Sequence, residues 1–227
     1  LAGGAMVSSL AGYDDGEWWV QDAAAALPVR LLRPQAGERI LDVCAAPGGK
    51  TMQLAQAGAH VTALDISPRR MQRVRRNLQR TDLNGEVVVV DALKYRGEAF
   101  DAVLLDAPCS GTGTIRRHPD LPYAKDSGGF AALFGLQQAM LDHALSLLKP
   151  GGRLVYCTCS LLFDEGEEQI KDLMARAPGC IVVPDALRVA GIDAGWIGEF
   201  GLRTRPDFWP ELGGMDGFFM TVLQKPA

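Results

Sequence analysis

Short apolar runs alternate with helical patterns from residue 39 onward, and this alternation restricts the fold more than any other feature of the sequence. Strands are predicted at 39–43, 60–64, 86–90, 100–105, 153–157 and 217–223, and helices at 49–57, 67–80, 133–148 and about 167–175. Strands and helices that alternate at these lengths are typical of a parallel sheet covered by helices on both faces. The sequence therefore predicts a doubly wound α/β fold.

Local signals support several of these boundaries. Ser67 is the expected N-cap of the second helix, with Pro68 at its first position. The run Lys-Pro-Gly-Gly at 149–152 is predicted to separate the long third helix from the next strand. Asp164 and Glu167 have capping-box spacing and are expected to begin the last helix. Two segments, 110–130 and 184–214, are irregular, and the first is long enough to be a functional loop.

The composition is that of a globular protein and limits its location. Of 227 residues, 48% are hydrophobic and 22% are charged, so one substantial domain is expected. No apolar run is long enough to cross a membrane and no secretory signal precedes the domain, so a cytoplasmic protein without a membrane partner is expected. The sequence opens at Leu1 without an initiator methionine, as a fragment of a longer protein would.

Net charge and cysteine usage narrow the possible functions. The net charge of −4 excludes a protein that binds phosphates over its whole surface, so any nucleic-acid contact must rest on local basic patches. Five cysteines form an odd set that makes a disulfide framework improbable. The three histidines are scattered and there is no Cys-x-x-Cys pair, so no metal site, and in particular no zinc site, is expected.

Aspartates stand at or just after the ends of four successive predicted strands, namely Asp42, Asp65, Asp91 and Asp106. In open parallel sheets, ligands bind beyond the carboxyl ends of the strands, so we expect these four side chains to lie in register around a ligand. Asp65 is placed like the acid that accepts hydrogen bonds from ribose hydroxyls, and Asp91 is expected beside an adenine.

The loop after the first strand, Cys44 to Lys50, indicates which ligand this is. Gly48 and Gly49 let the backbone approach a ligand, but the loop has neither the Gly-x-Gly-x-x-Gly pattern nor the spacing of a phosphate-binding loop. A ligand with a ribose and an adenine but no pyrophosphate suits this arrangement, and S-adenosylmethionine is such a ligand. A dinucleotide is the alternative.

Five stretches of the chain make the sequence similar to a known family, the Sun (Fmu) family of S-adenosylmethionine-dependent RNA 5-methylcytosine methyltransferases. They are WVQDAAAALP (19–28), LDVCAAPGGKT (41–51), LLDAPCSGTGTIRRHPD (104–120), LVYCTCSLLFDEGEEQI (154–170) and GGMDGFF (213–219). The resemblance implies a Rossmann-like class I methyltransferase with a mostly parallel, seven-stranded sheet and an antiparallel C-terminal strand. It divides the chain into a helical lead-in at 1–36 and a catalytic domain at 37–227.

The resemblance also implies the roles of individual residues. Cys159, in Thr-Cys-Ser, would be the nucleophile that attacks the base, and Cys109, in Ala-Pro-Cys-Ser, would help to release the product. Asp106 would hydrogen-bond the cytosine edge and Lys50 would reach the base. The expected cofactor-binding residues are Cys44, Ala45, Ala46, Pro47, Gly48, Gly49, Lys50, Asp65, Arg70, Asp91 and Asp106.

The chemistry of cytosine methylation requires such residues, whatever the family resemblance implies. Carbon 5 of cytosine is a poor nucleophile, so a thiolate that adds at carbon 6 is needed to activate it. A second group must then remove the proton from carbon 5. Amino-group methyltransferases have an aromatic ring where this chain has Cys109, which favours carbon over nitrogen methylation. Cys157 and Cys180 are expected to be core residues.

Two basic clusters are candidates for RNA contact. One is Arg116-Arg117-His118 in the irregular segment at 110–130. The other comprises the six arginines of the predicted helix at 67–80, for which a merely solvated helix face is equally compatible with the pattern. The resemblance points to the bacterial branch that modifies 16S ribosomal RNA, in which an additional RNA-binding domain precedes the catalytic one. A monomer is expected. A tRNA methyltransferase of the same family and a cofactor-binding module inactive on its own are the alternatives.

Overall fold

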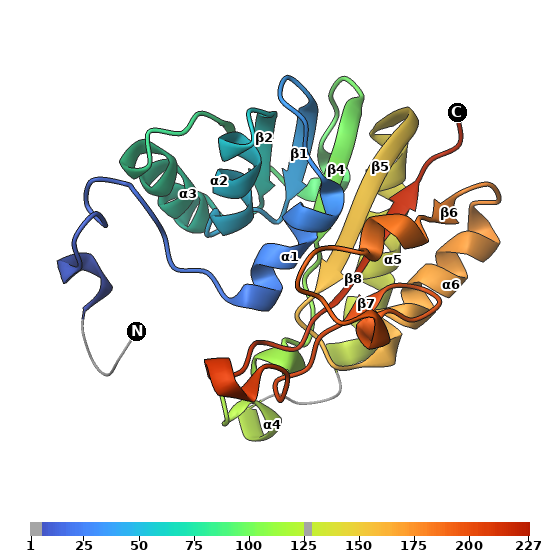
Figure 1. Ribbon diagram of the computed structural model, residues 1–227. Coiled ribbons are helices and arrows are strands. Elements are labelled where there is room, and N and C mark those ends of the chain that lie inside the picture. The colour runs from blue at the N-terminus through green and yellow to red at the C-terminus, as the bar shows by residue number, and fades with distance from the viewer. Residues whose placement is uncertain (1–5, 125–128) are drawn as a thin grey trace.

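The computed structural model describes residues 6–124 and 129–227, and these form one mixed sheet of eight strands with helices on both faces (Figure 1). The strands are β1 (Arg39–Val43), β2 (His60–Asp65), β3 (Glu86–Val89), β4 (Phe100–Asp106), β5 (Leu148–Thr158), β6 (Ile181–Val182), β7 (Leu202–Arg203) and β8 (Phe219–Gln224). Their order is β3-β2-β1-β4-β5-β8-β6, and β7 also pairs with β8. The predicted doubly wound α/β fold is confirmed.

Strand direction changes only at the C-terminal side of the sheet. Strands β1 to β5 pair in parallel, whereas β8 runs antiparallel to β5, β6 and β7. The antiparallel last strand was predicted, but the expected number of seven strands was one too few. The strands without a predicted range are β6 and β7, each of two residues and therefore too short to produce a periodic signal.

The helices are α1 (Ala23–Leu32), α2 (Gly49–Gln56), α3 (Pro68–Arg80), α4 (Leu121–Ala124), α5 (Phe130–Ser146) and α6 (Glu167–Arg176). The strands alternate their buried side chains between two faces, as Ile40 and Leu41 show. Helices α1, α2 and α3 cover the face that contains Ile40, and α5 and α6 cover the other (Figure 1). No helix among the described residues is both long and apolar enough to cross a membrane.

The predicted local signals have different outcomes. Ser67 caps α3 by accepting a hydrogen bond from the Arg70 backbone N–H, as expected. The capping box at Asp164 and Glu167 is wrong, because α6 begins after Gly166 without a side-chain cap and Glu167 instead forms an ion pair with Arg203. The run at 149–152 does not separate the helix from the strand as predicted. It is part of β5, which already begins at Leu148. The register between β4 and β5 shifts beside this run.

The segment predicted as a long loop, 110–130, has short helices within it. Thr112–Thr114 form one turn of 3-10 helix and α4 follows at Leu121, while residues 125–128 lie outside the described part of the chain. This segment leaves the carboxyl end of β4 and so borders the expected ligand site (Figure 1).

Candidate active site

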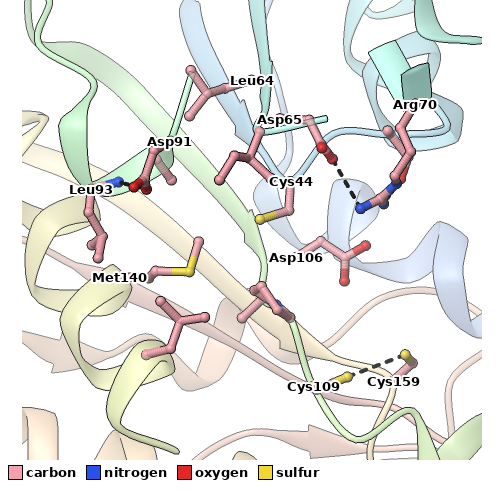
Figure 2. Close-up of a pocket in the computed structure, with 16 residues that line it drawn as sticks. Cys44, Leu64, Asp65, Arg70, Asp91, Leu93, Asp106, Cys109, Met140 and Cys159 are labelled. Atoms are coloured by element: carbon pink, nitrogen blue, oxygen red, sulfur yellow. Dashed lines mark hydrogen bonds and ion pairs between the residues drawn. The ribbon is translucent and has the colours of Figure 1, made fainter. Parts of the chain in front are cut away.

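A cavity of about 410 Å³ lies at the carboxyl ends of the parallel strands (Figure 2). Its lining residues are Cys44, Ala46, Leu64, Asp65, Ile66, Arg70, Asp91, Ala92, Leu93, Asp106, Ala107, Pro108, Cys109, Leu136, Met140 and Cys159. Asp65, Asp91 and Asp106 therefore come together around one cavity from three different strands, as the sequence pattern predicted.

The carboxylates on the β2 and β3 side are held by short local hydrogen bonds. Asp65 is buried, accepts a hydrogen bond of 2.9 Å from the Ser67 backbone N–H, and faces the Arg70 guanidinium at 3.4 Å. Arg70 also donates to the Ala46 carbonyl at 2.7 Å, which ties α3 to the loop after β1. Asp91 accepts from the Leu93 backbone N–H at 3.0 Å. Both carboxylates keep acceptor capacity for ligand hydroxyls.

Apolar side chains complete this cavity, and the sequence analysis missed them. Leu136 and Met140 line the cavity from α5, one helical turn apart, and Met140 lies near Leu93 (Figure 2). Helical periodicity places such residues on one apolar face of the helix, but it does not say which cavity that face lines. The cavity between these apolar side chains and the strand ends suits a flat apolar ring.

Asp42 departs from the prediction that four aspartates lie in register. In the parallel pairing of β1 with β4 it faces Leu104, two residues before Asp106, so it lies deeper in the sheet. It is fully buried and accepts a hydrogen bond of 2.5 Å from the Thr51 hydroxyl. Burial raises the pKa of Asp42 to about 7, although Thr51 and Lys50 oppose this shift.

The loop after β1 separates the first cavity from a second one of about 810 Å³. Cys44, Ala46 and Asp106 border both cavities, whereas Ala45, Pro47, Gly49, Lys50 and Asp42 border only the second. Gly48 borders neither; its φ of +107° is a backbone conformation that favours glycine. Burial followed by the nearby carboxylates raises the pKa of the Cys44 thiol to about 12, so this cysteine is a neutral wall residue.

Lys50 and Asp106 form an ion pair between the two cavities. The Lys50 ammonium donates to Asp106 Oδ2 at 2.8 Å, with the Lys50 side chain 10% and the Asp106 side chain 30% exposed. Burial alone would lower the pKa of Lys50, but the charge of Asp106 and its hydrogen bond, together with the Cys157 side chain, hold this pKa above its ordinary value. Lys50 also lies 5.5 Å from the centre of the Phe218 ring. It is a fixed positive charge.

The two cysteines singled out by the sequence face each other at the edge of the first cavity (Figure 2). Their Sγ atoms are 3.4 Å apart, too far for a disulfide and close enough for a thiol to hydrogen-bond a thiolate. The hydrogen bond from Cys109 lowers the pKa of Cys159, and Lys50 acts in the same direction against burial and Asp106. The same contact, followed by burial, raises the pKa of Cys109 well above its usual value. Cys159 is thus the stronger candidate for the thiolate.

Glu165 holds the two cysteine loops in place, and the sequence analysis missed it. Its fully buried carboxylate accepts hydrogen bonds from the Ser110 backbone N–H at 2.8 Å, the Ser110 hydroxyl at 2.5 Å and Gln137 Nε2 at 3.0 Å. The Ser110 and Ser160 hydroxyls, each next to one of the cysteines in the chain, are 3.2 Å apart. Its only signal was a glutamate shortly after Thr-Cys-Ser, which the capping-box interpretation did not use.

The predicted RNA-contacting arginines of segment 110–130 form ion pairs within the chain. Arg117 makes a two-pronged contact with Asp216, which is 1% exposed, and Arg116 contacts Asp22 at 3.0 Å. Both arginines border the second cavity. This arrangement joins the segment before α1, the segment after β4 and the segment before β8. Their predicted contact with RNA stays a prediction.

Two solved structures from one archaeon are similar to this chain over nearly its whole length. NSun6 from Pyrococcus horikoshii, solved with SFG, superposes with a TM-score of 0.84 at 28% identity, covering 98% of this chain and 57% of that one. A methyltransferase homologue from the same organism superposes with a TM-score of 0.79 at 30% identity, covering 97% and 72%. The fold is that of the Rossmann-like methyltransferases.

The comparisons of sequence narrow this class to one family. The family described as 16S rRNA methyltransferase RsmB/F matches residues 29–224. Ribosomal RNA small subunit methyltransferase B from Vibrio cholerae is 43% identical over 225 residues, which are 96% of this chain and 49% of that protein. The chain belongs to the 16S rRNA methyltransferase RsmB/F family, and it spans about half the length of the curated relatives it matches.

Proposed function

We propose that this chain is the catalytic part of an RNA cytosine-5 methyltransferase that modifies small-subunit ribosomal RNA. The observation that carries the proposal is the pair of thiols 3.4 Å apart, Cys109 and Cys159, at a cavity that Asp106 also lines. A single buried cysteine would have a core role as its simplest explanation. Two facing thiols with opposite pKa shifts match a reaction that needs one nucleophile and one group to finish the reaction.

The methyl donor is S-adenosylmethionine, and the cavity of about 410 Å³ is its site. The carboxylates of Asp65 and Asp91 would bind the ribose hydroxyls and the adenine edge, and the apolar side chains of Leu93, Leu136 and Met140 would contact the adenine ring. When bound, this cofactor supplies an electrophilic methyl group. The relative from Pyrococcus horikoshii was solved with SFG, an analogue of this cofactor, which supports the assignment.

Cys159 begins the reaction on the cytosine. Its thiolate forms a bond to carbon 6, and the electron pair of the 5,6 double bond becomes available at carbon 5, which takes the methyl group. The proton on carbon 5 then passes to a base, for which Cys109 or a water that it positions is the candidate. As that proton leaves, the double bond re-forms, the bond from Cys159 to carbon 6 breaks and the thiolate is released.

Lys50 and Asp106 act on the base during this addition. Asp106 accepts a hydrogen bond from the exocyclic amino group, and the ammonium of Lys50, already 2.8 Å from this carboxylate, offsets negative charge that develops on the ring. Because both groups are held by each other and by the surrounding core, little reorganisation is needed when the base arrives.

Ribosomal RNA is proposed as the substrate because the matching family and the relatives are named as ribosomal RNA methyltransferases. The target must be single-stranded or flipped out of its stack to reach the thiols. Transfer RNA is the second candidate. We also propose that the protein acts as a cytoplasmic monomer without a metal; among the described residues, no group of three or more His, Cys, Asp or Glu side chains could hold one.

Methyl transfer from labelled S-adenosylmethionine to unmodified small-subunit ribosomal RNA and to tRNA tests the proposal. Wild type should label carbon 5 of cytosine, Cys159→Ala should label nothing, and Cys109→Ala should accumulate a covalent protein–RNA adduct. Cys180→Ala, which changes a buried cysteine away from the cavity, is the matched control and should behave as wild type. Activity retained in Cys159→Ala would overturn the mechanism, and labelling of tRNA alone would overturn the substrate.

A further inference from the structure

Helix α3 concentrates positive charge in a chain whose net charge is negative. Its thirteen residues, Pro68–Arg80, contain six arginines and no acidic residue, while the whole chain carries −4. Met71, Val74 and Leu78 bury the apolar face of the helix against the domain. The remaining faces are therefore strongly basic.

Three of the six arginines have structural partners. Arg70 contacts Asp65 and the Ala46 carbonyl, Arg75 donates to the Val87 carbonyl at 3.3 Å, and Arg80 donates to carbonyls of the N-terminal segment and lies over the Tyr13 ring. These contacts join α3 to the loop after β1, to β3 and to the N-terminal segment.

The other three, Arg69, Arg73 and Arg76, are exposed, and their side chains form no ion pair or hydrogen bond to any residue that the structure describes. Their spacing of four and three residues places them in one stripe along the helix, opposite the buried face. Over this spacing the helix rises by about 10 Å.

The stripe is electrostatically unfavourable for the isolated protein. Like charges at these spacings repel each other, and Arg69 lies in the first turn, where the helix dipole disfavours a cation. In contrast, Arg116 and Arg117 are paired with carboxylates. The two basic clusters therefore differ in whether their guanidinium groups are free to bind another anion. Three adjacent unpaired guanidinium groups are complementary to a polyanion.

We propose that Arg69, Arg73 and Arg76 form a docking surface for the phosphate backbone of the substrate RNA. The surface begins beside the cofactor cavity, because Arg70, the neighbour of Arg69, lines that cavity (Figure 2). An RNA strand that crosses it is held against the domain next to the site of methyl transfer. This assignment rests on the proposed function, since it takes RNA as the partner.

The test compares the protein with a variant that carries Arg69→Gln, Arg73→Gln and Arg76→Gln. Binding of a fluorescein-labelled fragment of unmodified small-subunit ribosomal RNA is measured by anisotropy at several salt concentrations. With about 0.7 counterions released per single-stranded phosphate contact, three lost contacts reduce the slope of log K against log salt by about 2 and weaken binding roughly 50-fold at 0.15 M salt. The Arg→Lys version of the same triple variant should keep most of the binding.

The matched control removes three positive charges on α6 and just after β6, which lies at the other end of the strand order from β3, with Lys171→Gln, Arg176→Gln and Arg188→Gln. S-adenosylmethionine binding by calorimetry should be unchanged in every variant, which separates this surface from folding and from the cofactor site. Wild-type affinity in the α3 variant, or an equal loss in the control, would overturn the docking surface. Failure of the wild type to methylate any RNA would overturn the proposed function, whereas a selective loss of binding in the α3 variant would still support the surface.

Discussion

Asp42 is expected to lower the free energy of unfolding of this protein as the pH rises from about 4 to about 7. Its side chain is fully buried, Oδ1 has no hydrogen-bond partner among the described residues, and only the Thr51 hydroxyl contacts Oδ2. Burial therefore raises the pKa of Asp42 from 3.8 to about 7 in the folded state. The unfolded chain releases this proton near pH 3.8, but the folded chain retains it up to about pH 7.

The sign and size of the effect follow from this difference. A folded-state pKa above the unfolded one gives stability that is complete below pH 3.8 and is lost as the pH rises to 7. At 1.36 kcal/mol per pH unit, the whole loss is about 4 kcal/mol, and about 3 kcal/mol of it falls between pH 5 and pH 8. A domain of this size changes its Tm by roughly 2–4 °C per kcal/mol.

The substitution Asp42→Asn should remove this pH dependence, since an amide does not titrate. The free energy of unfolding of the variant relative to wild type, measured by urea denaturation, should increase by about 3 kcal/mol from pH 5 to pH 8 and then stay level. An unpaired amide N–H reduces the absolute gain at every pH by about 1–3 kcal/mol, so the slope is the quantity to measure.

Asp101→Asn is the control with the opposite sign. The hydrogen bond from Lys149, followed by that from the Arg39 backbone N–H, lowers the pKa of Asp101, so its contribution is present above the unfolded pKa and is lost as the pH falls. This variant should lose stability at neutral pH and match wild type in acid. A difference between Asp42→Asn and wild type that stays constant from pH 5 to pH 8 would refute the reasoning.

Three further predictions concern the site. Glu165→Gln places an amide N–H against buried donors and should lower the free energy of unfolding by about 2–3 kcal/mol in urea; a change below about 0.5 kcal/mol would show that the carboxylate is not needed. Lys50→Met removes the partner of Asp106 and should reduce turnover in the methyl-transfer assay by about 10²-fold while leaving S-adenosylmethionine binding intact; unchanged turnover would exclude its role. Because its pKa is lowered, Cys159 should react with iodoacetamide first of the five cysteines at pH 7.5, by mass spectrometry of timed samples; earlier labelling of Cys180 would contradict this.

The fold could be predicted because its signals are local. Buried parallel strands have continuous apolar runs, and those at 39–43 and 60–64 agree with β1 and β2 to within one residue at each end. Ser67 and Pro68 identified the start of α3 correctly. The two-residue strand β7 could not be found in this way, because a strand of that length exists only through its pairing with β8.

The ligand site was predictable to the level of the sheet edge. Carboxyl ends of parallel strands meet at one edge, so Asp65, Asp91 and Asp106 could be expected to converge, and they do. The register of neighbouring strands is not encoded in either strand alone, and for this reason the depth of Asp42 was misjudged. A shift of two positions turns a site residue into a buried carboxyl group with a raised pKa.

The ion pairs and buried hydrogen bonds could not be predicted from the sequence, because the partners lie far apart in the chain. Arg117 and Asp216 meet only when the segments after β4 and before β8 are both folded, and Glu165 meets Ser110 in the same way. Two arginine clusters that are alike as sequence patterns thus differ physically: one is neutralised within the domain, and the stripe on α3 is not. Since like charges along one helix face repel each other until an anion neutralises them, the pairing state, rather than the number of arginines, is the basis for proposing the α3 stripe as the RNA-docking surface.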